Sequence, residues 1–293
     1  MIRAVETDAD LEAWLEVRNA VVPNEPATVD QVRRDMEPDR ILLVAEEDGR
    51  ATGCGLAALS SFGAKAFVAV RVLPEQRRRG IGSALYAACA AHARSLGRDG
   101  VNAFVYADEP HSIAFAEHFG LRDVDYQLEQ VRIVGDEPAP AAVPGIELRA
   151  VGDDRDVLVQ RVWTELAEAV YPELPLPGEV TYSEEAFLRD EATRPEGTFV
   201  ALEDGAVVGY AGLLEHGSGP ATAEHGLTAV RRDCRRRGIA HALKVAQLQW
   251  AGQNEVARLV TWTQKGKEAM QALNRSLGYV DQAKVITFQG PLP

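Results

Sequence analysis

The feature that most constrains this chain is a charged phrase that occurs twice. Residues 77–86 read RRRGIGSALY, and residues 235–244 read RRRGIAHALK. The glycine of the first phrase, Gly80, returns as Gly238, 158 residues later. Self-similarity over such a length indicates a structural unit that has been duplicated. We therefore expect two copies of one fold.

The length of the chain agrees with two domains. Its 293 residues suffice for two domains of ordinary size, each with its own core. A stretch rich in proline, alanine and glycine separates the copies. We predict an N-terminal domain over residues 1–136, a linker over 137–145 and a C-terminal domain over 146–293.

The second copy is longer than the first near its beginning. The proline-spaced stretch 171–178 accounts for the extra length, and its prolines predict a long loop. Long loops on a rigid scaffold often carry specificity. The sequence leaves open whether this one shapes a binding site or is an inert surface insertion.

Composition and charge exclude several classes of protein. No apolar run approaches the roughly 18 residues of a membrane span, and the first ten residues lack the pattern of a secretory signal. Three cysteines without paired spacing, Cys54, Cys89 and Cys234, predict reduced thiols and no metal site. We expect a cytoplasmic protein. A net charge of −13 disfavours nucleic-acid and membrane partners and suits a cationic small molecule or basic peptide.

Each copy has the element order of an α/β domain. An opening strand and an amphipathic helix precede a hairpin, whose turn is Asp48-Gly49 in the first copy and Asp204-Gly205 in the second. A further strand, 66–72 or 226–230, runs into the arginine phrase, which opens an alanine-rich helix. Another strand, a helix and a closing strand complete each copy, so a mixed sheet with helices on its faces is predicted.

The arginine phrase is suited to bind phosphate. The first N–H groups of a helix lack internal partners, the helix dipole is positive there, and glycine allows close approach of the backbone. The chain has no Gly-x-x-x-x-Gly-Lys-Ser/Thr motif, and Gly80-x-Gly82 lacks the third glycine of a dinucleotide-binding loop. A solvated basic turn is the weaker explanation, because arginines at a helix N-terminus need an anion to offset their repulsion.

On these residues the chain resembles the GCN5-related N-acetyltransferase (GNAT) family, whose acetyl-CoA pyrophosphate loop reads Gln/Arg-x-x-Gly-x-Gly/Ala after a central strand. The second copy is similar to the tandem actinobacterial type that includes mycothiol synthase, through residues 228–230 and Asn274-x-x-Leu277-Gly278-Tyr279. The resemblance implies two tandem GNAT-like domains, each a mixed, mostly antiparallel sheet flanked by helices. It also implies an N-acetyltransferase that uses acetyl-CoA and a small-molecule amine or peptide.

The resemblance further implies which residues contact the cofactor. They comprise strand residues that would pair with the pantetheine arm and the loop residues that follow them in each copy. In the first copy they are Val70, Val72, Arg77, Arg78, Arg79, Gly80, Ile81, Gly82 and Ser83. In the second copy they are Thr228, Val230, Arg235, Arg236, Arg237, Gly238, Ile239, Ala240 and His241.

A general acid is not evident from the sequence. Many family members place a tyrosine four residues before the closing Gly-Phe, where this chain has Ala116 and Asn274. The leaving thiol has a pKa near 8.5 and departs with little help, so this loss weakens the enzyme assignment without removing it. Tyr279 or a water would substitute as the acid.

The candidates for a general base lie in the second copy. Glu224 and His225 precede Gly226 there, whereas the first copy has only the apolar residues 67–69. We therefore predict chemistry in the C-terminal domain with Glu224, His225 and Tyr279 as candidate catalytic residues. The alternative for Glu224 and His225 is a solvent-facing pair in a loop.

Two classes of function remain open at this stage. The first is the N-acetyltransferase, and the second is a non-catalytic acyl-CoA-binding sensor or scaffold that has kept the loops. A nucleophilic role for Cys234 beside the second arginine phrase is disfavoured, because direct transfer is the usual route of the family. The acceptor and the oligomeric state are not determined by the sequence.

Overall fold

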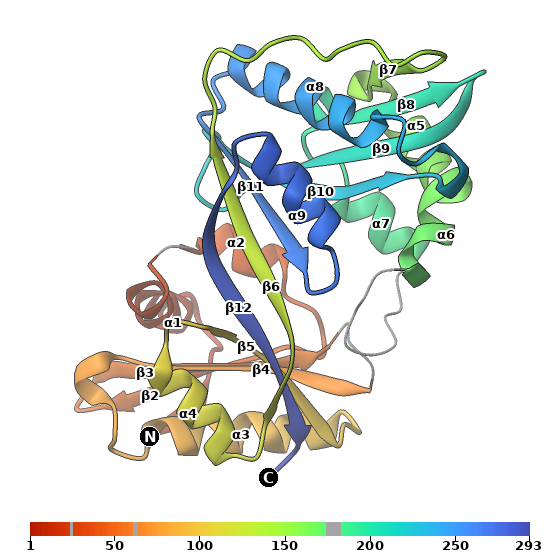
Figure 1. Ribbon diagram of the computed structural model, residues 1–293. Coiled ribbons are helices and arrows are strands. Elements are labelled where there is room, and N and C mark those ends of the chain that lie inside the picture. The colour runs from red at the N-terminus through yellow and green to blue at the C-terminus, as the bar shows by residue number, and fades with distance from the viewer. Residues whose placement is uncertain (24–25, 61–63, 174–182) are drawn as a thin grey trace. The chain divides into compact units, whose positions relative to one another are not determined.

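The computed structural model describes residues 1–23, 26–60, 64–173 and 183–293. These residues divide into two compact units (Figure 1). Unit 1 contains residues 1–126 and 284–293, and unit 2 contains residues 127–173 and 183–283. Each unit is an α/β domain, as the sequence predicts.

Unit 1 is a mostly antiparallel sheet with helices on both faces (Figure 1). Its strand order is β1 (Ile2–Ala4), β2 (Ile41–Glu47), β3 (Arg50–Leu59), β4 (Lys65–Val72), β5 (Gly100–Tyr106) and β12 (Val280–Pro291). Within the described residues of this unit, β4 and β5 are the parallel neighbours, and the other pairings are antiparallel. Helices α1 (Asp8–Val21) and α2 (Val29–Arg34) pack on one face, and α3 (Ile81–Ser95) and α4 (Pro110–His118) pack on the other.

Unit 2 repeats this arrangement. Its strand order is β6 (Arg122–Ile133), β11 (Arg258–Gln264), β10 (Thr222–Val230), β9 (Ala206–Glu215), β8 (Phe199–Glu203) and β7 (Glu147–Ala150). One face carries α5 (Arg155–Val162), a π-helical turn (Trp163–Ala167), α6 (Glu168–Val170) and α7 (Glu184–Asp190). The other face carries α8 (Ile239–Gln253), and α9 (Glu268–Ser276) follows β11.

The closing strand of each sequence copy lies in the sheet of the other unit. Residues 127–133 of β6 pair with β11, and residues 285–291 of β12 pair with β5, both antiparallel. The units of the structure thus differ from the predicted domains 1–136 and 146–293 at these strands. Apolar alternation identifies a strand and its buried face but not the neighbour with which it pairs. The predicted linker 137–145 contains no helix or strand.

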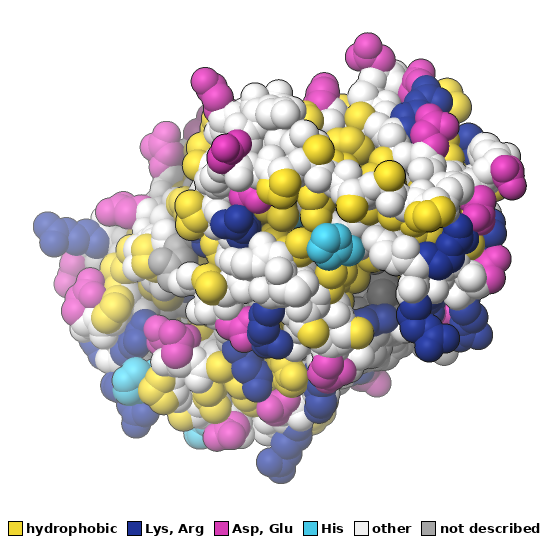
Figure 2. All heavy atoms as spheres, turned by 45° about the horizontal axis from the view of Figure 1, so that its top comes forward, with side chains coloured by type: hydrophobic (Ala, Val, Ile, Leu, Met, Phe, Trp, Pro, Cys, Tyr) yellow, Lys and Arg dark blue, Asp and Glu magenta, His cyan; other side chains and the backbone are white. Residues whose placement is uncertain are grey.

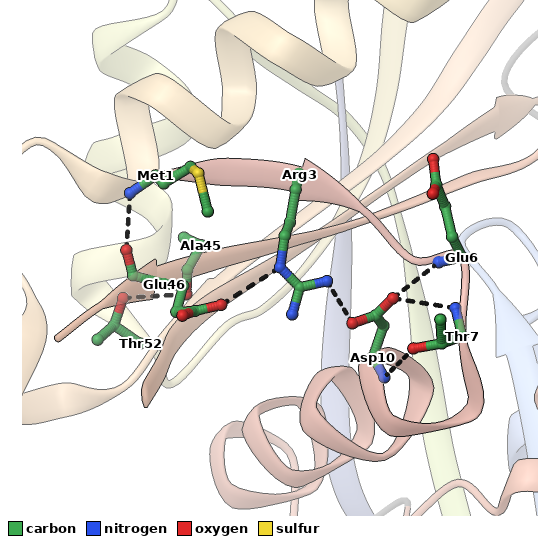
Figure 3. A network of polar contacts seen from close by, with 8 residues as sticks. All are labelled: Met1, Arg3, Glu6, Thr7, Asp10, Ala45, Glu46 and Thr52. Atoms are coloured by element: carbon green, nitrogen blue, oxygen red, sulfur yellow. Dashed lines mark hydrogen bonds and ion pairs between the residues drawn. The ribbon is translucent and has the colours of Figure 1, made fainter. Parts of the chain in front are cut away.

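A polar network fixes the start of unit 1 (Figure 3). Thr7 Oγ1 accepts a hydrogen bond from the Asp10 N–H at 3.2 Å, and Asp10 Oδ2 accepts one from the Thr7 N–H at 2.9 Å. This capping box begins α1. Arg3 of β1 forms ion pairs with Asp10 and Glu46. Hydrogen bonds from the Glu6 N–H and from Arg3 lower the pKa of Asp10, so the network is charged and joins the first strand to the first helix.

Candidate functional site

Both arginine phrases form the same turn before a long helix. Arg78 and Arg236 each have a φ of 63°, and Gly80 and Gly238 have φ values of 82° and 85°. Glycine adopts this left-handed conformation without the steric penalty of a side chain. A Cβ at either glycine would meet no atom within 4 Å, so the conformation and not crowding requires glycine here.

Helices α3 and α8 begin without a side-chain cap. The N-cap residue is Gly80 in one and Gly238 in the other, whereas Thr7 caps α1. The backbone N–H groups of residues 81–83 and 239–241 therefore have no intrahelical acceptor. Because the helix dipole is also positive at this end, both turns are suited to bind a phosphate group.

The first arginine of each phrase turns back onto the strand that precedes it. Arg77 Nε donates to the carbonyl oxygen of Val72 at 3.2 Å, and Arg235 Nε donates to that of Val230 at 3.0 Å. These bonds close the end of β4 and β10 in the same way. In both arginines the Nε–H group thus stabilises the conformation of the loop.

The third arginine of each phrase pairs with an acid of the neighbouring hairpin. Arg79 lies 2.6 Å from Glu47, and Arg237 lies 2.8 Å from Glu203. Arg237 lowers the pKa of Glu203, so this pair is ionised. The middle arginines, at positions 78 and 236, are exposed and have no hydrogen bond or ion pair within the described parts of the chain.

A carboxylate of the predicted insertion 171–178 reaches the loop of unit 2. Glu173 Oε2 lies 2.8 Å from the guanidinium of Arg235, and Glu173 Oε1 lies 3.4 Å from that of Arg232. The bond from Arg235 lowers the pKa of Glu173. Residues 174–178 of this stretch lie outside the described residues.

The central parallel pairing stops halfway in both units. β4 pairs with β5 only at residues 65–67, and β10 pairs with β11 only at residues 222–224. The N–H groups of Leu73 and Arg231 bond instead to β3 and β9. The N–H and C=O groups of successive residues point to opposite sides of a strand. Four residues therefore direct these groups toward the side from which the parallel neighbour has diverged. They are the predicted cofactor positions Val70, Val72, Thr228 and Val230.

The strand β10 contains a bulge. His225 and Thr228 pair with Leu213 and Ala211 of β9, so the two residues between them face a single residue. The corresponding strand of unit 1, β4, pairs with β3 without any shift over residues 66–72. Bulges re-aim side chains and occur preferentially next to active sites.

The bulge changes the face of β10 to which each side chain points. His225 before it and Val230 after it both pack toward α8, although one position number is odd and the other even. Ala229 packs on the opposite face, with Trp163. Side chains alternate along a strand, so Glu224 shares the face of Ala229 and lies away from His225.

The structure brings two of the predicted catalytic residues together. His225 Nε2 lies 2.5 Å from the hydroxyl of Tyr279, and the two residues are only 6% and 2% exposed. Burial lowers the pKa of His225 well below its usual range and raises the pKa of Tyr279. Both are therefore neutral near pH 7, and a hydrogen bond joins His225 Nε2 to the hydroxyl of Tyr279.

Lys244 of α8 belongs to the same cluster. It is 1% exposed, and its Nζ lies 5.5 Å from the ring centroid of Tyr279. Within the described chain this nitrogen has no hydrogen-bond partner, and burial lowers the pKa of Lys244 to about 7. Sequence reasoning missed this residue, because a lysine at the end of an arginine-rich phrase is typical of a solvated helix face.

Asn274, which stands where many family members have a tyrosine, contacts β6, the closing strand of the first sequence copy. Asn274 is fully buried, and its Nδ2 donates to Gln130 Oε1 of β6 at 2.9 Å. Gln130 in turn donates to Asp281 at 2.8 Å. Asn274 thus connects α9 to β6.

The cysteines form no disulfide. All three are free and buried. Burial raises the pKa of Cys234 in spite of the nearby Arg231, so its thiol is protonated near pH 7. A thiolate nucleophile at this position is not supported.

The described residues also bear on metal binding, membrane spanning and surface charge. In the described ranges, no group of three or more His, Cys, Asp or Glu side chains is arranged to bind a metal ion. In the same ranges, no helix combines the length and the apolar character that crossing a bilayer requires. Figure 2 shows acidic and basic side chains interspersed over one face.

Comparisons with known proteins match both copies. The profile of the acetyltransferase (GNAT) family matches residues 9–121 and 163–279. A mycothiol acetyltransferase of Kocuria rhizophila is 25% identical over 280 residues, 89% of either chain. One from Mycolicibacterium vanbaalenii is 30% identical over 224 residues, 75% of this chain and 71% of that one.

Solved structures share the tandem fold. A GCN5-related N-acetyltransferase from Sphaerobacter thermophilus has a TM-score of 0.79 at 21% identity, over 100% of this chain and 95% of that one. A tandem GNAT protein from the clavulanic acid biosynthesis pathway has a TM-score of 0.77 at 22% identity, over 100% and 98%. The predicted fold class and the predicted resemblance are confirmed.

Proposed function

Because this chain belongs to the acetyltransferase (GNAT) family, we propose that it transfers an acetyl group from acetyl-CoA to the amine of a small molecule or peptide, with the chemistry in unit 2. The bulge in β10, which β4 lacks, carries the assignment to unit 2. It lies where the parallel strands diverge, directly after Glu224 and His225.

The residues of unit 2 fit acetyl-CoA. The uncapped N–H groups of residues 239–241 would hold its pyrophosphate, and the backbone of Thr228 and Val230 would pair with its pantetheine arm. Thr228 Oγ1 is buried and has no partner within the described residues, which supports a ligand at this strand. Unit 1 offers the same loop at residues 81–83. Acetyl-CoA supplies the acetyl thioester when bound.

Glu224 is the proposed general base. An amine with a pKa near 10.4 carries a proton at neutral pH and must lose it before the nitrogen can attack. Glu224 lies beside the bulge, on the face of β10 covered by the π-helical turn and α7. The Glu224 carboxylate would take this proton, and the freed nitrogen would then form the amide bond as the bond from the acetyl carbon to sulfur breaks. The departing thiolate would take up the second proton that the nitrogen loses.

His225 and Tyr279 stay predictions as catalytic residues. Their buried hydrogen bond holds the strand immediately before the bulge, and a tyrosine with a raised pKa contributes a hydrogen bond more readily than a proton. The thiol needs little assistance to depart, so the chemistry does not depend on a strong acid.

The relatives suggest which acceptor to test first. Several are named mycothiol acetyltransferases, so the amine that those enzymes acetylate comes first, followed by a panel of polyamines, aminoglycosides and basic peptides. The net charge of −13 favours a cationic acceptor.

The alternative function is a non-catalytic acyl-CoA-binding sensor. The absence of a tyrosine at Asn274 and Ala116 favours it. The two functions are distinguished by mixing acetyl-CoA with each amine and following the release of free thiol. We expect release with at least one amine and its loss in Glu224→Gln. Binding of acetyl-CoA without thiol release for any amine would support the sensor.

A further inference from the structure

Glu191, just after α7, contacts the bulge of β10 directly. Its side chain is buried, with 8% of the residue exposed. Its Oε1 accepts a hydrogen bond from the N–H of Leu227 at 3.0 Å, and its Oε2 accepts one from the hydroxyl of Tyr210 at 3.1 Å. Leu227 is one of the two residues in the bulge, so Glu191 satisfies an N–H that the strand ladder leaves unpaired.

Two glycines make room for this carboxyl group. A Cβ at Gly212 of β9 or at Gly226 of β10 would lie closer to Glu191 Oε2 than real Cβ contacts allow. Glycine within a strand weakens it and often marks a bulge or a close approach. Here the close approach is that of the Glu191 carboxyl.

The backbone around Glu191 is held in place by one arginine. Arg155 of α5 donates to the carbonyl oxygens of Leu188 at 2.6 Å, Glu191 at 2.7 Å and Ala192 at 3.2 Å. Ala192 has a φ of 53°, which a non-glycine residue adopts only when its surroundings require it. The hydrogen bonds from Arg155 therefore fix the turn that places the Glu191 carboxyl group against the bulge.

We propose that Glu191 is a positioning residue that holds the bulge of β10 and thereby turns Glu224 toward the face covered by α7. If all residues of β10 were kept but the bulge were lost, strict alternation would place Glu224 on the same face as Val230, toward α8. Unit 1 shows the regular case: Val72 packs on the α3 face, and Phe67, which forms the last parallel pair as Glu224 does, packs on the α1 face with one residue fewer between them and no bulge. In unit 2 the bulge takes up the additional residue, so that Glu224 keeps the corresponding face. The proposal rests on the proposed function only where it makes Glu224 the base.

Burial also raises the pKa of Glu191. A protonated carboxyl keeps one oxygen free to accept from Leu227, and a glutamine of the same length can do the same. Glu191→Gln should therefore preserve the bulge, and Glu191→Met, which has no acceptor, should not. Gly226→Ala keeps the glutamate but pushes its carboxyl away. Asp190→Ala is the matched control, because Asp190 is an exposed neighbour paired with Arg189.

The experiment measures three quantities in each variant: amide hydrogen exchange at Leu227 by NMR, the affinity for acetyl-CoA, and kcat with the best amine. We expect faster exchange in Glu191→Met and Gly226→Ala, with kcat lowered ~10²-fold by the misplaced base and acetyl-CoA affinity retained. Glu191→Gln and Asp190→Ala should resemble the unmodified protein. Using two disruptive variants keeps the test decisive if one of them does not fold.

Unchanged exchange at Leu227 in both disruptive variants would overturn the proposal. Faster exchange with an unchanged kcat would overturn it as well, because the bulge would then not position the base. If the unmodified protein acetylates no amine, the proposed function fails instead, and the exchange at Leu227 still reports whether Glu191 holds the bulge.

Discussion

The strands β4 and β10 lead into loops of the same conformation but differ just before them. Arg78 and Arg236 share a φ of 63°, and the glycines that follow them share the left-handed region. β4 is regular along its length, whereas β10 is bulged. A duplicated fold has thus kept one turn conformation and changed the strand beside it, so the two features vary independently.

The pairing registers show which residues are equivalent in the two units. Phe67 and Glu224 both form the last parallel pair of their strand, opposite Asn102 and Val260. Where unit 1 has an aromatic side chain, unit 2 has a carboxylate.

The two units also differ in the helix that follows each loop and in the turn before each closing strand. Equal spacing from the loop glycines places Tyr86 at the position of Lys244, and Leu121 at that of Tyr279. Unit 1 thus has a tyrosine and a leucine where unit 2 has a buried lysine and a tyrosine. The chemistry is accordingly expected in unit 2.

Removing the proposed base, Glu224, should have the largest effect on activity of the substitutions that follow. We expect Glu224→Gln to lower kcat by ~10²–10⁴-fold, because the amine then lacks a positioned acceptor for its proton. Acetyl-CoA affinity should persist. Phe67→Leu at the equivalent position of unit 1 is the control and should leave kcat unchanged. Full activity in Glu224→Gln would contradict the role of this carboxylate.

The buried lysine should give unit 2 a pH-dependent stability. The pKa of Lys244 is about 7 in the fold against 10.5 for a free lysine, so the unfolded chain binds more protons between these values. The free energy of unfolding then rises with pH in this window, by about 2–3 kcal/mol between pH 7.5 and 9.5. Lys244→Met should remove that rise, as measured by denaturant unfolding. Lys265→Met, at an exposed site, should keep it, and equal slopes in both variants would contradict the prediction.

The hydroxyl of Tyr279 should have a smaller effect on stability. Tyr279→Phe leaves His225 Nε2 without its partner at 2.5 Å, which typically costs ~1–3 kcal/mol for a buried group. Tyr86→Phe is the matched variant of unit 1, because that buried hydroxyl has no partner within the described residues. Chemical denaturation should show a loss only for Tyr279→Phe. Equal losses would mean that the hydrogen bond to His225 is not important.

The loops could be predicted from the sequence because their signal is local. Gly80 and Gly238 each lie between a strand and a helix within one short phrase, so the backbone conformation follows from neighbouring residues. The cofactor contacts predicted for Val70, Val72, Thr228 and Val230 stay predictions, although the parallel strands diverge beside these residues. The exchange of β6 and β12 could not be predicted, because strand partners are a non-local choice.

The bulge of β10 and its contact with Glu191 could not be predicted from the sequence for the same reason. The sequence places Glu224 and His225 next to each other in one strand, whereas the bulge at the two residues that follow depends on counting residues against a partner strand. Glu191 lies 36 positions before Leu227 and resembles a surface acid in its local sequence. The glycines at 212 and 226, inside predicted strands, were the available signal of a close approach.

The most direct test of the central claim compares Gly80→Glu with Gly238→Glu. The two substitutions put the same carboxylate into the same left-handed position, with φ values of 82° and 85°, so they impose matched strain and matched repulsion of phosphate. The measurement is the rate of amine-dependent thiol release from acetyl-CoA. We predict that Gly238→Glu abolishes it and that Gly80→Glu retains it. Loss of the rate in Gly80→Glu with retention in Gly238→Glu would contradict the assignment of chemistry to unit 2.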